Sequence, residues 1–181
     1  MVKIIVTSSR RPTPRIRSLV KDLAMILPGA ERLTRGHLSM QELASEAILR
    51  GAERVVIVGG RKGNPSILRI YEVKKGDLLN IVTFIIRGVA LSRELKRPLP
   101  HESPERMIVE TDGNPLSDEF ADAFVQAFSA RVLEKPLDKD IIAAISLDRS
   151  GNYVRVEFVF QGRRVGPRLK LAKPAEMVKV H

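Results

Sequence analysis

Residues 3–27 read KIIVTSSRRPTPRIRSLVKDLAMIL, and this stretch contains the patterns of a strand, a loop and a helix in immediate succession. Residues 3–7 are apolar and rich in β-branched side chains, which predicts a buried strand. Thr13 can cap a helix whose first position is Pro14. The helix then has one apolar face, formed by Ile16, Leu19, Val20, Leu23, Ile26 and Leu27.

The same plan recurs in the second half of the chain, which begins with RMIVETDGNPLSDEFADAFVQAF at residues 106–128. A strand precedes a loop, Ser117 is the expected N-cap, and three phenylalanines lie on one helical face. Residues 92–105 contain three prolines and many charges, which indicates a linker. We therefore predict an α/β fold of two similar half-domains, residues 1–91 and 106–181, each a mixed β-sheet with packed helices. We attribute the likeness to internal duplication, and the alternative is a single mixed sheet whose order is repetitive.

The remaining elements follow from shorter signals. Ser39 and Glu42 have the spacing of a capping box and predict a second helix. Residues 59–65 are expected to be a loop and residues 162–166 a turn, because both stretches are rich in glycine. The predicted strands are residues 31–34, 53–58, 67–73, 78–90, 141–147, 153–161 and 167–172.

Charge is distributed unevenly along the chain. The 181 residues carry a formal charge of +10; residues 1–105 contain 19 basic and 10 acidic side chains, whereas residues 106–181 contain 12 and 11. A basic surface on the first half would attract a polyanion. The chain has no cysteine and no apolar run long enough to span a bilayer. We expect a soluble, cytoplasmic protein without disulfides, thiolate chemistry or a membrane partner.

Residues 8–17, SSRRPTPRIR, place four arginines at the start of the first helix. Cations at a helix N-terminus oppose the helix dipole, whereas the matching helix of the second half begins with Asp118 and Glu119, which complement it. An unfavourable concentration of positive charge is what an anion site requires, and guanidinium groups match phosphate oxygens. The alternative is a solvated basic loop. The expected phosphate-binding residues are Ser8, Ser9, Arg10, Arg11, Thr13, Arg15 and Arg17.

A second basic cluster occupies the stretch QGRRVGPRLK at residues 161–170. It offers Arg163, Arg164, Arg168 and Lys170 as further RNA-binding candidates. The alternative is a strand edge protected by charge. The sequence leaves open whether the two clusters form one surface.

The ligand and reaction classes can be narrowed. Aromatic residues make up 4% of the chain and tryptophan is absent, so recognition of an RNA backbone is favoured over stacking of bases. Residues 55–65, VVIVGGRKGNP, lack the ending of a P-loop and the spacing of a dinucleotide-binding loop. We find no catalytic constellation and no metal-binding pattern, so we expect no enzyme activity and no cofactor.

Residues 7–43 resemble the opening signature of Brix-domain proteins. The resemblance rests on Ser8-Ser9-Arg10, Pro12-Thr13-Pro14-Arg15, Lys21-Asp22 and Arg35-Gly36, and on Gly166-Pro167-Arg168 before the last strand. It extends in order over nearly the whole chain and is greatest for the short archaeal form, near the small-subunit processome branch.

This resemblance implies a ribosome biogenesis factor that binds pre-rRNA or a small guide RNA and works with other assembly proteins. It adds Lys21 and Arg35 to the RNA-binding candidates. It also implies that each half resembles the anticodon-binding domain of class II aminoacyl-tRNA synthetases. One departure is Arg163-Arg164, where family members often carry an acidic residue. The alternatives are a tRNA-binding module of anticodon type and an enzyme acting on a phosphorylated substrate.

Overall fold

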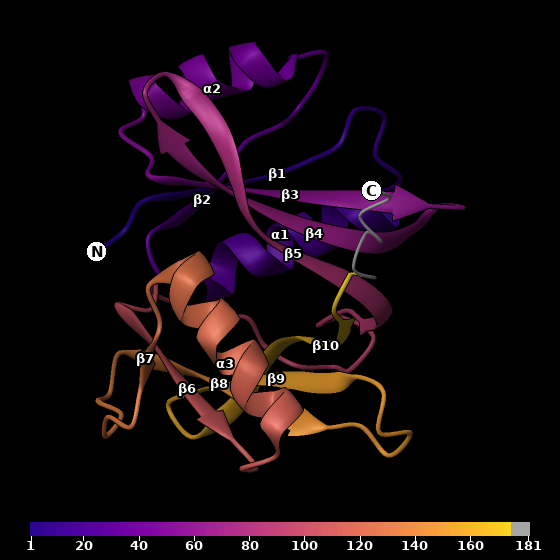
Figure 1. Cartoon of the computed structure of the whole chain (residues 1–181), viewed down its shortest axis with the longest axis vertical. Coiled ribbons are helices and arrows are strands. Elements are labelled where there is room, and N and C mark those ends of the chain that lie inside the picture. The colour runs from indigo at the N-terminus through magenta and orange to yellow at the C-terminus, as the bar shows by residue number, and fades with distance from the viewer. Residues whose placement is uncertain (175–181) are drawn as a thin grey trace, which may run out of the picture.

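The computed structural model describes residues 1–174, which form one mixed ten-stranded β-sheet and three helices (Figure 1). The predicted second half therefore extends beyond the described residues from position 175 onward. The helices are α1 (Pro14–Ile26), α2 (Met40–Leu49) and α3 (Pro115–Phe128). The strands are β1 (Ile4–Ser8), β2 (Ala30–Arg32), β3 (Arg54–Arg61), β4 (Asn64–Lys74), β5 (Asp77–Ala90), β6 (Arg106–Thr111), β7 (Arg131–Val132), β8 (Asp140–Leu147), β9 (Val154–Phe160) and β10 (Arg163–Ala172).

The two halves of the sheet have the same strand order. Read inward from its edge, each half has its second strand first, followed by its first, third, fourth and fifth strands. The order is β2-β1-β3-β4-β5-β10-β9-β8-β6-β7. Strand β1 is parallel to β2 and β3, as β6 is to β7 and β8, and the other neighbours are antiparallel. The predicted α/β class is confirmed, and the two halves join through β5 and β10 into one continuous sheet. An origin by duplication stays a prediction.

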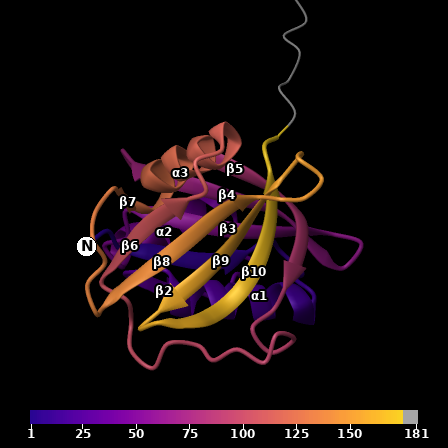
Figure 2. The same cartoon turned by 90° about the horizontal axis from the view of Figure 1, so that it is seen from below.

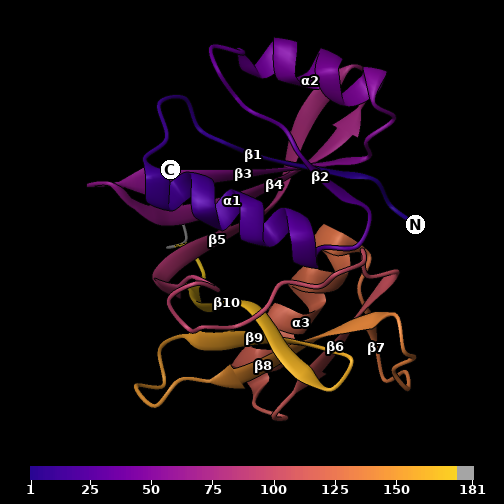
Figure 3. The same ribbon diagram turned by 180° about the vertical axis from the view of Figure 1, so that it is seen from behind.

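The helices lie on both faces of the sheet. Helices α1 and α3 lie between the two half-sheets, and α2 covers the outer face of the N-terminal half (Figures 1 and 3). The larger core unites side chains from α1, α3 and eight of the strands, whereas a smaller core lies beneath α2. Viewed from below, β6, β8, β9 and β10 face the viewer with no described helix over them (Figure 2).

Aromatic packing connects the two halves. Phe84 of β5 is buried against two rings of α3, with centroid distances of 5.7 Å to Phe120 and 5.4 Å to Phe124. Phe124 in turn contacts Phe128 edge-on at 5.4 Å. Because a strand of one half packs on the helix of the other, the halves share a hydrophobic core.

The helix starts confirm most of the capping predictions and correct one. The Thr13 hydroxyl accepts from the Ile16 N–H at 3.4 Å, and Pro14 is the first helical residue of α1. The capping box of Ser39 and Glu42 is present at the start of α2. The prediction of Ser117 as N-cap is wrong, because Asn114 caps α3 by accepting from Leu116 N–H and Pro115 follows it. Each of α1 and α3 therefore starts with a polar cap followed by proline.

The loop predicted at residues 59–65 is present as a turn, but its predicted length is wrong. Strand β3 continues to Arg61, and Lys62 and Gly63, with φ of 50° and 82°, form a two-residue hairpin turn. Gly60 lies within β3. A Cβ at this residue would lie 2.3 Å from the Cδ1 of Ile16, so glycine is needed here for α1 to pack closely on the strand.

The predicted turn at 162–166 is wrong for a related reason. Gln161 and Gly162 have φ of 51° and 74° and complete the turn in two residues. Strand β10 therefore starts at Arg163, and the predicted start at residue 167 falls inside it. The register shifts between Val165 and Leu169, which disrupts the ladder near Gly166.

The segment between the halves has no helix or strand from residue 91 to residue 105. It is nevertheless fixed near its start and near its middle. The buried Asp22 carboxylate of α1 accepts from the backbone N–H and the hydroxyl of Ser92, both at 2.8 Å. The Pro98 carbonyl accepts from Gly166 N–H at 3.1 Å. These contacts hold the segment against α1 and β10.

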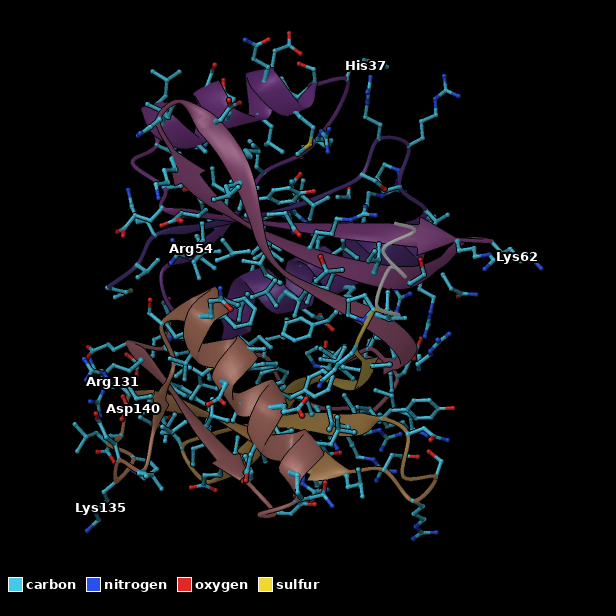
Figure 4. The ribbon with its side chains drawn as sticks, viewed as in Figure 1. His37, Arg54, Lys62, Arg131, Lys135 and Asp140 are labelled. Atoms are coloured by element: carbon cyan, nitrogen blue, oxygen red, sulfur yellow. The ribbon has the colours of Figure 1, made fainter. Side chains whose placement is uncertain are left out.

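We expect Asp140 to stabilise the folded protein at neutral pH and to lose this effect in acid. Its buried carboxylate accepts from Arg106 Nε and Nη2 at 2.9 and 2.6 Å and from Leu137 N–H at 2.8 Å, and Arg131 lies nearby (Figure 4). The hydrogen bonds from Arg106, opposed by desolvation, lower the pKa of Asp140. A carboxyl whose pKa is lower in the folded state stabilises the protein above its unfolded pKa, about 3.9, and loses this effect as pH falls through the folded pKa.

We expect Asp140→Asn to lower Tm at pH 7 by about 3–8 °C. The difference from the unsubstituted protein should shrink as the pH is lowered below about 4, where Asp140 itself becomes protonated. Circular dichroism melts at pH 7, 4 and 2.5 measure this, with the exposed Asp138→Asn as control. A Tm difference that does not change with pH would contradict it.

Candidate nucleic-acid interface

A cavity of about 380 Å³ lies beside the N-terminus of α1. It is found where the parallel strands β1 and β2 end, an edge at which open α/β sheets commonly hold ligands. We call it the basic pocket, and its lining residues are Ser8, Arg11, Pro12, Arg17, Val20, Arg32, Leu33, Thr34, Arg35, Gly36 and His37. This lining contains four guanidinium groups and no carboxylate.

Arg35 is the buried cation of this pocket. Its side chain comes from the loop between β2 and α2 and the residue is only 6% exposed. The Arg35 Nε donates to the Leu38 carbonyl at 2.8 Å and Nη1 to the Ser8 carbonyl at 3.1 Å, and no carboxylate in residues 1–174 forms an ion pair with it. Burial, and secondarily the charge of Arg10, lower the pKa of Arg35. A buried cation beside a second cation would gain from a bound anion.

Four other basic side chains predicted for this site remain available to a ligand. Arg10, Arg11, Arg17 and Lys21 are exposed, and none forms an ion pair within the described part of the chain. Arg17 Nη1 donates to the Pro12 carbonyl at 2.8 Å, which stiffens the loop. Arg10 and Lys21 do not line the cavity itself but flank it in sequence.

Two of the three hydroxyl groups expected to bind phosphate, those of Ser8 and Thr13, are engaged within the protein. Ser8 is buried and its hydroxyl donates to the Ser9 carbonyl at 2.8 Å. The Thr13 hydroxyl caps α1 and donates to Gly63 O at 2.8 Å, which joins the loop to the β3–β4 hairpin. Ser9 is half-buried and does not line the pocket. These residues shape the loop, and the guanidinium groups remain the available donors.

Arg15 has a structural contact instead of a place in the pocket. It forms an ion pair with Glu94, and its Nη2 donates to the Val89 carbonyl at 2.9 Å. Glu94 also accepts from Leu91 N–H at 3.1 Å, so Arg15 fixes the start of α1 to the end of β5. The hydrogen bond from Arg15 lowers the pKa of Glu94. Arg15 was expected to bind an anion, but its charge is already matched by this carboxylate.

The second basic cluster does not line the basic pocket. Glu157 lies 3.2 Å from Arg97, 3.3 Å from Arg164 and 3.9 Å from Arg168, so one carboxylate faces three guanidinium groups. Lys170 lies 3.5 Å from Asp148. Arg163 has no ion pair among the described residues and lines a separate cavity of about 420 Å³ beside the linker segment. Most of this second cluster is thus partly neutralised.

The C-terminal half has a cavity at the matching place with the opposite charge. Counting from Pro14 and Pro115, Arg17 of α1 corresponds to Asp118 of α3, and Lys21 corresponds to Asp122. This acidic pocket, about 630 Å³, is lined by Val109, Glu110, Thr111, Asp118, Ala121, Asp122, Val132, Leu133 and Glu134. Its lining contains four carboxylates and no basic side chain. The strand–helix plan therefore does not dictate the charge of the site.

Sequence reasoning did not assign Arg32, Thr34 and His37 to the site. His37 projects near the start of α2, and Lys62 marks the tip of the β3–β4 hairpin (Figure 4). The feature of the sequence that could have found them is the predicted strand at residues 31–34. This strand pairs in parallel with β1, and the carboxyl ends of parallel strands meet at one edge of a sheet. That signal was weak because β2 has only three residues.

Two further findings concern the described residues alone. Within residues 1–174 no helix is both long and apolar enough to cross a membrane. The same residues contain no group of three or more histidines or carboxylates able to hold a metal ion.

Comparisons with known proteins identify relatives over the full length. A probable Brix domain-containing ribosomal biogenesis protein of Aeropyrum pernix is 51% identical over 175 residues, covering 96% of this chain and 97% of that protein. A protein of the same description from Pyrococcus furiosus is 31% identical over 187 residues, covering 93% and 82%. No protein-family model matches the sequence.

Solved structures are also similar to this one, and two of them illustrate the range of similarity. The crystal structure of a probable ribosomal biogenesis protein from Aeropyrum pernix has a TM-score of 0.90 at 50% identity and covers 99% of this chain and 100% of its own. Mil, an archaeal Imp4-like protein, has a TM-score of 0.68 at 19% identity, covers 94% of this chain and 97% of its own, and supports the fold alone.

Proposed function

Because the chain belongs to the family of Brix domain-containing ribosomal biogenesis proteins, we propose that it is a non-enzymatic ribosome biogenesis factor that binds pre-rRNA. The observation that carries the RNA-binding part is the basic pocket. Its four guanidinium groups have no carboxylate partner in the described chain, and one of them is buried. An RNA phosphate would supply the missing negative charge.

The electrostatics of α1 support the same proposal. The helix has no acidic residue in its first turn, so Arg11, Arg17 and the positive end of the helix dipole reinforce one another. Such an arrangement is unfavourable in the free protein and becomes favourable when an anion binds. Arg10, Arg11, Arg17, Lys21, Arg32 and Arg35 form the proposed primary contact surface.

The second cluster would contribute a weaker contact. Arg163, Arg164, Arg168 and Lys170 lie on β10, and three of the four share acidic neighbours. We assign them a supporting role, because an RNA phosphate must compete there with Glu157 and Asp148. We also propose that the two halves descend from one ancestral unit, and that this unit resembles an anticodon-binding domain. A small guide RNA and other assembly proteins are its further expected partners, and the cytoplasmic location stays a prediction.

Crosslinking tests the proposed ligand directly. The full chain, expressed with an affinity tag in its native host, is irradiated in cells, and the covalently bound RNA is purified under denaturing conditions and sequenced. We expect fragments of pre-rRNA, or of a small guide RNA paired with it, to be enriched over an untagged control. Dominant enrichment of tRNA would favour the anticodon-type module instead, and no enrichment of any RNA would contradict the proposal.

A further inference from the structure

The basic pocket is a hollow with a partly apolar lining, and this lining bears on the kind of RNA that fits. Pro12, Val20 and Leu33 contribute apolar surface, while Arg11 and Arg17 lie on its lining beside the helix start. The backbone of a duplex presents its phosphates on a convex ridge, which a flat basic surface is sufficient to bind. A phosphate alone would leave the apolar part of the hollow unfilled.

The position of Arg35 adds a second, independent observation. Its guanidinium is held by the Leu38 and Ser8 carbonyls, lines the hollow, and has no carboxylate partner in residues 1–174. The residue is 94% buried by its exposure of 6%. A protein tolerates such an unmatched buried cation where a ligand brings the opposite charge inside.

We propose that the basic pocket binds one unpaired nucleotide of the RNA. Its phosphate contacts Arg11, Arg17 and Arg35, and its base lies over Pro12, Val20 and Leu33. The inference rests on the proposed function and specifies the ligand as RNA with a bulged or single-stranded nucleotide. A base that is already unpaired pays the smallest penalty for leaving its stack. The apolar faces of the base lose contact with water when they pack on these apolar side chains.

The size and composition of the pocket agree with this ligand. About 380 Å³ is in the usual range for a small-molecule site, whose mostly apolar walls carry a few oriented polar groups. No phenylalanine, tyrosine or tryptophan lines the pocket, and His37 is the one aromatic ring in its lining, so the base would be held mainly by enclosure instead of by stacking. The acidic pocket of the other half has a comparable position but would repel the phosphate.

The test compares three labelled hairpin RNAs by fluorescence anisotropy at fixed salt: fully paired, with a one-nucleotide bulge, and with the same bulge lacking its base. We expect the bulged hairpin to bind the full chain about tenfold more tightly than the paired one. The abasic bulge should lose most of this gain, because its phosphate remains but the apolar contact is gone.

A pocket-filling variant gives a second readout. Thr34 is exposed and lines the pocket, so Thr34→Leu adds bulk there without changing charge. It should lower affinity for the bulged hairpin more than affinity for the paired hairpin, and so remove the preference for the bulge. Thr111→Leu, which makes the same change at a residue lining the acidic pocket, is the control and should leave the preference intact.

The outcomes separate the two levels of the proposal. Equal binding of all three hairpins, or a bulge preference that survives Thr34→Leu, would overturn the unpaired-nucleotide inference while RNA binding itself stands. Failure of the unsubstituted chain to bind any of the hairpins would overturn both the inference and the proposed function.

Discussion

Replacing Arg10, Arg11 and Arg17 together by alanine should lower affinity for structured RNA by about a hundredfold or more at about 50 mM salt. The three side chains are exposed and have no ion pair within the described residues, so RNA phosphates are their expected partners. The salt dependence should flatten as well, because each lost phosphate contact removes about 0.7–0.9 from the slope of log K against log salt.

The same triple substitution should leave the free energy of unfolding unchanged or increased. Cations beside the N-terminus of α1 oppose its dipole, each by roughly 0.3–1 kcal/mol when exposed, and their removal relieves this repulsion. Affinity is measured by filter binding across a salt series, and stability by urea unfolding of the same preparations. Higher stability with lower affinity is the combination that a functional cluster predicts.

Two controls make the result specific. Arg15→Ala removes the contacts to Glu94 and Val89, so it should lower Tm instead of acting mainly on affinity. Substitution of exposed lysines outside the pocket, Lys74, Lys75 and Lys135, removes an equal charge. If this lysine variant loses as much affinity as the arginine variant, general electrostatics and not the pocket explains binding. An arginine variant that binds like the unsubstituted protein would reject the site.

The fate of Arg15 illustrates what the sequence does not determine. Arg11, Arg15 and Arg17 look alike within residues 8–17, and their charge conflict with the helix dipole is visible locally. Arg15 finds Glu94 across 79 positions of sequence, through the placement of the linker segment against α1. A local pattern can predict that a cation lies at a helix start, but only the tertiary contacts decide which cation is already neutralised.

The fold was predictable where a local signal had one meaning. Thr13 before Pro14, and Ser39 before Glu42, each satisfy free N–H groups in a way that a loop does not require, and both helices begin there. Gly59 and Gly60 had two meanings, since glycine occurs in loops and also where backbones approach closely. The packing of Ile16 on Gly60 selects the second meaning, and no local feature reveals that contact.

The contrast between the two pockets is an argument about function within one molecule. Both are at the carboxyl edge of parallel strands beside a proline-started helix, so the fold supplies the same hollow twice. Arg17 lines one pocket, whereas Asp118 and Asp122 line the other, and Lys21 of α1 occupies the position that Asp122 has in α3. The helix dipole favours an acidic residue at the positions of Arg17 and Asp118, so the basic residue in α1 is a feature that the proposed RNA contact would explain.

Phe84→Ala should cost the largest share of stability among the substitutions considered, about 3–5 kcal/mol. The ring is 2% exposed and packs on Phe120 and Phe124 of the other half, so its removal leaves a cavity between the halves. At this chain length the loss corresponds to a fall in Tm of roughly 6–20 °C. Differential scanning calorimetry should show one transition that moves as a whole, because both halves contribute to the same core.

The exposed Leu79→Ala on the same strand is the matched control, and its Tm should stay within about 2 °C of the unsubstituted protein. A Phe84→Ala melt that splits into two transitions, with only one of them shifted, would mean that the halves fold as separate units. The prediction of a shared core would also be contradicted if Phe84→Ala lowered the free energy of unfolding no more than Leu79→Ala does. A single shifted transition would mean that the basic pocket, which depends on α1 being held in place, loses its geometry whenever the C-terminal half unfolds.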